Sequence, residues 1–308
     1  MKTPIAFIIF NRPDTTAKVF EAIRQARPSK LFVIADGPRQ DKIGDADKCI
    51  ETRSIIDQVD WDCEVIKNYS DINLGCGKRL PSGLDWVFQQ VEEAIIFEDD
   101  CLPDISFFPY CEELLEKHRH DTRITMISGN NFQLGRRRTS DSYYFSHYGG
   151  IWGWATWRRA WSYNDVDMRL WNTIYQGGWL KDILEDNSAV KSWERIFQDV
   201  YEKKLNTCWD YQWVFTCWIQ NGLAIVPSVN LVSNIGFGAG ATHTTNEVNE
   251  LANLPVESMP LPLKNPEFIL RDVQTDRYTQ KKFYSTKLFG RIKNIIIKYL
   301  GMFKLDKF

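Results

Sequence analysis

The chain has 308 residues, a formal net charge of -2 and a hydrophobic fraction of 44%, values that are ordinary for a globular protein. Its seven cysteines form no Cys-x-x-Cys pair, and no apolar run approaches the roughly 20 residues that a membrane-spanning helix needs. The first residues also lack the apolar length of a signal peptide. We therefore expect neither a secreted nor a membrane-spanning protein, but a cytoplasmic one with no nucleic-acid partner.

Short apolar runs alternate with helix-patterned segments through the first hundred residues. The expected strands are residues 5–10, 30–35, 63–66 and 94–97, and the expected helices are residues 15–23, 49–59 and 83–93. Further helices are expected at 107–118 and 214–220, and strands at 124–131 and 223–227. Strands that alternate with helices build a parallel sheet covered by helices. The sequence therefore predicts an α/β fold, with a mostly parallel central sheet flanked by helices.

Polar residues follow three of the predicted strands. Arg12 follows the first, Asp36 the second, and the run Glu98-Asp99-Asp100 the fourth. In parallel sheets, ligands bind beyond the carboxyl ends of the strands, so we expect these side chains to face one crevice. A guanidinium suits a phosphate group, and carboxylates suit a hard divalent cation such as Mn²⁺ or Mg²⁺. Each residue alone also fits a solvated turn, but together they indicate a nucleotide-sugar site.

Other segments add candidates for that site. The loop at residues 73–79 is expected to bring Lys78 or Arg79 near phosphate, although a surface loop is an equal alternative. Glycines interleaved with tryptophans at residues 149–157 allow a ligand to approach the backbone. We expect Trp152, Trp154 and Trp157 to form the floor of an acceptor site, with core packing as the alternative.

Two residues of the second half are candidates for chemistry. Asp210 lies among aromatic residues, where partial desolvation favours a general base, and helix capping is the alternative. His243 ends a glycine-rich segment whose composition is typical of a loop that closes over a ligand. It is a candidate ligand for metal or phosphate.

The C-terminal segment differs from the rest of the chain. From Lys281 onward it holds eight basic residues and one acid, and its apolar residues from Leu288 to Phe303 recur at helical spacing. A basic amphipathic helix fits an anionic membrane surface, here the cytoplasmic face of the inner membrane. Packing on its own domain or on a second subunit is the alternative.

Taken in order, these motifs resemble those of a GT-A glycosyltransferase, and within that fold the N-acetylglucosaminyltransferase I group. The resemblance runs from about Ile5 to His243. Its motifs are Phe10-Asn11-Arg12-Pro13, Ile34-Ala35-Asp36-Gly37, Phe97-Glu98-Asp99-Asp100, Gly150-Ile151-Trp152-Gly153-Trp154, Trp209-Asp210 and the loop from Gly236 to His243.

The resemblance implies a Rossmann-like nucleotide-diphospho-sugar transferase fold. Asp100 would hold the Mn²⁺ that bridges the diphosphate, with Glu98 and Asp99 touching ribose and donor sugar. Residues 1–105 would form the nucleotide-sugar half of a single domain, residues 106–245 the acceptor-binding and catalytic half, and residues 246–308 a C-terminal extension.

The resemblance also assigns roles outside the acidic run. Arg12 would contact the phosphates, Asp36 the uracil ring, and Asp210 would be the catalytic base. The predicted function is a metal-dependent inverting glycosyltransferase acting in bacterial surface polysaccharide synthesis. It would move a sugar from UDP-GlcNAc or a similar UDP-hexose to a hydroxyl of a glycan or lipid-linked acceptor.

Two alternatives remain open at this stage. A sugar-phosphate nucleotidyltransferase would share the fold and the metal, but it would be expected to carry a glycine-rich loop with Arg and Lys after the first strand. A non-catalytic carbohydrate-binding protein would explain the aromatic residues. It would leave the acids and the arginine at the strand ends without a purpose.

Overall fold

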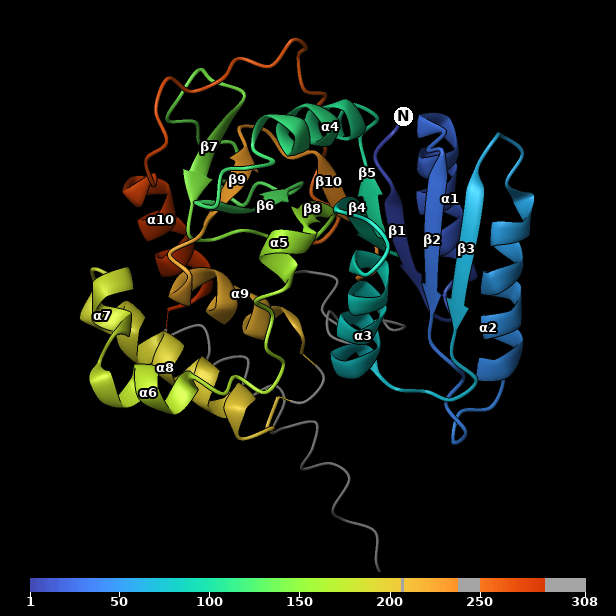
Figure 1. The fold of residues 1–308 in the computed structure, drawn as a ribbon, viewed down its shortest axis with the longest axis horizontal. Helices are drawn as coiled ribbons and strands as arrows, with labels where there is room; N and C mark the ends of the chain where they lie inside the picture. Colours follow the sequence, from blue (N-terminus) through green and yellow to red (C-terminus); the bar gives the residue numbers. More distant parts are fainter. Residues whose placement is uncertain (206–207, 238–249, 286–308) are drawn as a thin grey trace, which may run out of the picture.

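The computed structural model describes residues 1–205, 208–237 and 250–285 (Figure 1). Within these ranges, eight strands form one sheet in the order β3-β2-β1-β4-β8-β6-β9-β7, and β5 pairs with β10 in a second, two-stranded sheet. The strands are β1 (Ile5–Ile9), β2 (Lys30–Ala35), β3 (Glu64–Tyr69), β4 (Glu93–Glu98), β5 (Cys101–Pro103), β6 (Ile124–Ser128), β7 (Tyr143–Ser146), β8 (Trp154–Trp157), β9 (Leu223–Pro227) and β10 (Val232–Asn234).

Helices connect most of these strands and cover both faces of the large sheet. They are α1 (Pro13–Ala26), α2 (Asp45–Ser54), a 3-10 turn η1 (Ile55–Gln58), α3 (Cys76–Phe88), α4 (Phe107–Lys117), α5 (Arg158–Trp161), α6 (Trp171–Gly177), α7 (Leu180–Ile183), α8 (Asn187–Tyr201), α9 (Asp210–Ile219) and α10 (Val273–Phe283). Figure 1 shows β1 to β3 with α1 and α2 at one side of the molecule, and α6, α7 and α8 grouped at the other.

The first four strands in the chain are parallel neighbours, as predicted. Ile9 of β1 lies opposite Ala35 of β2, and Ile8 lies opposite Glu98 of β4. Because this register aligns the carboxyl ends of three strands, the residues that follow them emerge side by side. The predicted α/β fold with helices on both faces is confirmed.

The second half of the sheet is mixed. β8 is antiparallel to both β4 and β6, and β7 is antiparallel to β9, whereas β6 and β9 are parallel. Among the described strands of the eight-stranded sheet, parallel pairings therefore outnumber antiparallel ones by only four to three.

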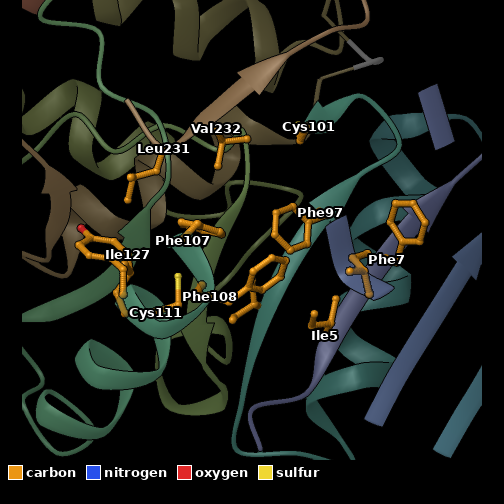
Figure 2. Close-up of a cluster of buried hydrophobic side chains, with 14 of the residues drawn as sticks. Ile5, Phe7, Phe97, Cys101, Phe107, Phe108, Cys111, Ile127, Leu231 and Val232 are labelled. Atoms are coloured by element: carbon orange, nitrogen blue, oxygen red, sulfur yellow. The ribbon is translucent and has the colours of Figure 1, made fainter. Parts of the chain in front are cut away.

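Successive side chains along each strand point to opposite faces of the sheet, and a separate core forms on each face. Ile5 and Phe7 of β1 and Phe97 of β4 point to the face covered by α1 and α4 (Figure 2). Phe97 packs against Phe107 and Phe108 of α4, with ring centroids 5.6 and 5.7 Å apart. This packing holds β4 rigidly up to the acidic run that follows it.

The opposite face carries α3, α5, α6, α8 and α9, whose apolar side chains join Ala6 and Ile96 in the second core. Gly83 lets α3 approach the sheet closely, since a Cβ at this position would lie 2.6 Å from the Ile34 side chain. The helix predicted at residues 83–93 lies earlier in the chain, where α3 spans Cys76–Phe88. It begins directly after Gly75, whose φ of 76° is not helical.

The described part of the predicted C-terminal extension packs on the second half of the sheet. α10 lies against β7, and the backbone of Arg271 forms an isolated parallel β-bridge with that of Phe145. Gln133 donates a hydrogen bond from Nε2 to Thr279 Oγ1 of α10 at 2.9 Å. The predicted basic helix from Leu288 lies outside the described residues. Among the residues that are described, no helix has the length and apolar character to cross a membrane.

Candidate active site

A cavity of about 500 Å³ opens at the carboxyl ends of β1, β2 and β4. The N-terminal ends of α3 and α9 and the end of β10 complete its walls. Segments that lie far apart in the sequence therefore meet here. The candidate residues that line it are Arg12, Asp36, Glu98, Asp99, Asp100, Trp152 and Asp210.

The acidic run after β4 forms an ion-pair network with the residue before α1. Arg12 donates from Nη1 to Asp100 Oδ2 at 2.7 Å and lies 3.7 Å from Asp99 Oδ1. Phe10 donates its backbone N–H to Asp99 Oδ2 at 3.2 Å. On the other side, Asn234 of β10 donates from Nδ2 to Asp100 Oδ1 at 3.4 Å. Asp100 is thus held by Arg12, which follows β1, and by Asn234 of β10, which are far apart in the sequence.

Negative charge is in excess at this point of the cavity. Burial, Asp100 and Asp99 raise the pKa of Glu98 well above its usual range, and Asp210 adds to this. Burial and Asp100 raise the pKa of Asp99 to about 7, although Arg12 opposes the shift. One guanidinium beside three carboxylates leaves a site that a further cation would stabilise.

Asp36 organises the loop opposite the acidic run. Its carboxylate accepts backbone hydrogen bonds from Gly37, Leu74 and Gly75, each at 2.9 Å, and one from Asn73 Nδ2 at 3.1 Å. A single buried side chain therefore fixes two loops at the rim of the cavity. Through these hydrogen bonds, Asp36 joins the turn after β2 to the loop before α3.

The two basic candidates of the loop at residues 73–79 behave differently. Lys78, one of the two predicted phosphate contacts, is exposed and does not line the cavity. Arg79 is 6% exposed, lines the cavity, and donates to Ala35 O at 3.1 Å and to Asn68 Oδ1 at 2.8 Å. Since successive helical residues point in different directions, the position of the helix start decided which of the two faces inward.

Asp210 is the first residue of α9 and lines the cavity. The capping position is Trp209, which makes no side-chain cap, so the capping alternative for Asp210 does not hold. A negative charge in the first helical turn is favoured by the helix dipole. The neighbouring ring of Tyr211 also lines the cavity.

The three tryptophans predicted for the acceptor site do not act together. Trp152 lines the cavity, but Trp154 and Trp157 are 1% and 2% exposed and belong to the two cores. Trp157 donates from Nε1 to Leu115 O at 3.1 Å, inside the core next to α4. The prediction for these two residues was wrong, because β8 lies between β4 and β6 and is covered on both faces.

The acidic run contains the ligand type that a divalent cation prefers, but its side chains are not arranged as a metal site in the structure. In the ranges that the structure describes, no group of three or more His, Cys, Asp or Glu is arranged to hold a metal ion. Asp100 offers hard carboxylate oxygens in a cavity with excess negative charge, which would suit a divalent cation. His243 lies outside the described residues.

Sequence patterns missed several residues of the cavity. Arg39 lies over the Phe10 ring at 5.2 Å and pairs with Asp45, its Nη2 and Oδ1 atoms 2.7 Å apart. Asn73 and Asn234 also line the cavity, where Asn73 donates a hydrogen bond to Asp36 and Asn234 donates one to Asp100. The only available signal for Arg39 was its place three residues after Asp36.

Comparisons with known proteins add solved structures but no family. No protein-family model matches the chain, and no curated protein matches it. The chain is similar to TarS 1-349 of S. aureus, with 11% identity, a TM-score of 0.37, and coverage of 54% of this chain and 50% of that chain.

Two further solved structures are similar to the chain. The galactosyltransferase LgtC, solved with donor and acceptor sugar analogs, shows 10% identity, a TM-score of 0.34, and coverage of 59% of this chain and 66% of that chain. The 4-diphosphocytidyl-2C-methyl-D-erythritol synthase of Anaerococcus prevotii shows 11% identity, a TM-score of 0.31, and coverage of 61% and 82%. At such identities and TM-scores these likenesses assign no activity, and the narrower resemblance to N-acetylglucosaminyltransferase I stays a prediction.

Proposed function

We propose that the chain is a divalent-metal-dependent inverting glycosyltransferase. It moves a sugar from a nucleoside diphosphate, UDP by the resemblance of its motifs, to a hydroxyl of a glycan or lipid-linked acceptor. The observation that carries the proposal is the convergence of Arg12, Asp36, Asp100 and Asp210 in one cavity at the ends of parallel strands. Its volume of about 500 Å³ is in the range of small-molecule sites.

Each donor group has a matching part of the cavity. The nucleoside binds beside the Asp36 loop, where carboxylate, amide and backbone groups are already fixed. Arg12 binds the diphosphate with its guanidinium. Asp100 would hold a divalent cation, which would supply charge neutralisation for the diphosphate.

The chemical step follows from the remaining carboxylate. Asp210 takes the proton of the acceptor hydroxyl as the oxygen forms a bond to the anomeric carbon. The bond from that carbon to the diphosphate oxygen breaks in the same step, and Arg12 stabilises the negative charge that develops on the leaving group. A single displacement inverts the configuration at the anomeric carbon.

The alternatives fit the cavity less well. The chain after β1 passes directly into α1 at Pro13, with Arg12 as the capping residue, so no glycine-rich loop with Arg and Lys follows this strand. A carbohydrate-binding protein has no need for the three carboxylates of the acidic run beside Arg12. The following experiments distinguish both alternatives from a glycosyltransferase by the ligands that bind and the products that are released.

The test is calorimetric titration of UDP with and without Mn²⁺ into the wild type, Asp100→Asn and Asp104→Asn. Asp104 is the matched control, because it lies in the same segment, directly after β5, but binds Ser106 and Ser258 and does not line the cavity. We expect Mn²⁺-dependent UDP binding that Asp100→Asn abolishes and Asp104→Asn retains. No binding of UDP or another nucleoside diphosphate with any divalent metal would refute the proposal.

Turnover then separates the two classes of enzyme. Incubation with UDP-sugars should release UDP, whereas release of pyrophosphate from a sugar phosphate and UTP would establish the nucleotidyltransferase alternative. Asp210→Asn should lower transfer by about 10²–10⁴-fold, the usual contribution of a general base, with UDP binding kept.

A further inference from the structure

A row of aromatic rings leads away from Trp152 along the edge of the sheet that carries the cavity. Trp152 packs edge-on against Phe237 on one side, with centroids 5.8 Å apart, and against Phe132 on the other, at 5.1 Å. Phe132 in turn contacts Phe283 at the end of α10, at 5.8 Å. All four rings are partly exposed, unlike the buried tryptophans of β8.

The four rings come from segments that are distant in the chain. They follow β6 and β10, precede β8, and end α10, so the row exists only in the folded protein. Since β8 runs antiparallel to β4, its first residue lies at the same edge as the carboxyl end of β4, where the acidic run begins. The row therefore continues the cavity wall toward the second half of the sheet.

The backbone on both sides of Phe132 is fixed. Asn131 donates its N–H to Asn230 Oδ1 at 3.0 Å and its side-chain amide to Pro227 O at 2.6 Å. Gln133 donates to Asn131 Oδ1 at 2.7 Å and to Thr279 on α10 at 2.9 Å. Both neighbours are buried, whereas the ring between them is not. Such anchoring holds the ring in place before any ligand binds.

The segment carrying Trp152 is anchored as well. Trp152 donates its N–H to Asn130 Oδ1 at 3.2 Å, and a Cβ at Gly150 would lie 2.0 Å from Asn130 Nδ2. The glycine thus permits the close approach that sets Trp152 against the loop after β6. Two adjacent loops are locked together, and each presents one ring of the row.

We infer that this aromatic row, formed by Phe237, Trp152, Phe132 and Phe283, binds the sugar units of an acceptor oligosaccharide that lie beyond the reacting hydroxyl. The inference rests on the proposed function. Flat rings with one exposed face bury the apolar face of a pyranose, while the sugar hydroxyls remain in water. Continuity with the cavity through Trp152 argues for the acceptor as the occupant. An acceptor of two or more sugars would then bind more tightly than a monosaccharide.

The test uses an array of oligosaccharides of one to six units, probed in the presence of UDP and Mn²⁺. The variants are Phe132→Ala, Phe132→Tyr, and Phe268→Ala as a control for an exposed phenylalanine outside the row, 66% exposed. Titration of the best-bound glycan, followed by tryptophan fluorescence, then gives affinities for it and for its shorter fragments.

We expect Phe132→Ala to weaken binding of the longer glycan about fivefold to tenfold, the effect of one aromatic contact. Phe132→Tyr and Phe268→Ala should bind like the wild type, and the shortest fragment should lose little. A purely structural role of Phe132 would instead weaken all fragments equally and lower the melting temperature. Either that pattern or the absence of any bound oligosaccharide would overturn the inference.

The outcome is separable from that of the proposed function. If UDP binds with Mn²⁺ but Phe132→Ala leaves glycan binding intact, the transferase proposal stands and the row falls. If Phe132→Ala loses the longer glycan but no nucleotide binds, the row stands and the protein is a carbohydrate-binding one.

Discussion

The ion pair between Arg12 and Asp100 gives the sharpest prediction, because a metal ion at Asp100 must compete for the same carboxylate oxygen. Nη1 and Oδ2 lie 2.7 Å apart, and the side chains are only 21% and 14% exposed. In Arg12→Met this competition disappears, so Mn²⁺ should bind more tightly in the absence of nucleotide. UDP should bind more weakly, since its diphosphate loses the guanidinium.

The magnitude follows from the burial of the pair. A hydrogen bond between charged groups contributes about 1.5–3 kcal/mol, and the carboxylates left without a partner can take up protons. We therefore expect Arg12→Met to lower the free energy of unfolding by about 2 kcal/mol without metal. Mn²⁺ at about a hundred times its dissociation constant should return about 2.7 kcal/mol.

Thermal unfolding of the wild type, Arg12→Met and Arg24→Met, with and without Mn²⁺ and UDP, tests this reasoning. Arg24 is the control, because it lies on α1, the helix that follows Arg12, and its ion pair with Asp60 is exposed. Mn²⁺ should raise the melting temperature most in Arg12→Met, and UDP with Mn²⁺ should raise it most in the wild type. Equal metal shifts in all three proteins would show that Asp100 does not bind metal in competition with Arg12.

Three further predictions follow from other contacts. Gly236→Ala places a Cβ 2.1 Å from Asp100 Oδ2, so Mn²⁺-dependent UDP binding measured by calorimetry should be lost; unchanged affinity would contradict this packing. Trp157→Ala should lower the free energy of unfolding in urea by about 3–5 kcal/mol, and a loss of acceptor binding without destabilisation would restore it to the acceptor site. Burial and Arg271 lower the pKa of His147 to about 4, so stability should fall as the pH drops from about 6.5 toward 4, because the unfolded chain takes up the proton first. His147→Gln should remove about 2–3 kcal/mol of this loss, and an unchanged pH profile in urea unfolding would disprove the assignment.

The predictions made from strand ends were the most successful. Arg12, Asp36 and Asp100 follow apolar runs whose type and length identify buried parallel strands, and the structure brings all three to one cavity. This works because parallel strands in register place their carboxyl ends at the same edge. The local pattern therefore carried information about contacts between distant residues.

The aromatic segment was harder to interpret. Trp152, Trp154 and Trp157 stand in the same glycine-interleaved sequence, yet only the first reaches the cavity. The other two lie in β8, a strand inside the sheet whose two faces are covered by the two cores. Nothing in the residues themselves distinguishes a central strand from an exposed loop with the same composition.

The sequence by itself determined the alternating strands and helices, the polar strand ends and the excess of acid after β4, since each depends on neighbouring residues and their periodicity. Only the tertiary structure decided that Asp210, Asn234 and Phe132 meet this edge, and that α3 begins where Arg79 rather than Lys78 faces inward. These outcomes depend on the order of strands in the sheet and on contacts between segments that are distant in the sequence. A short window of sequence does not specify either, because many chain paths bury the same apolar residues equally well.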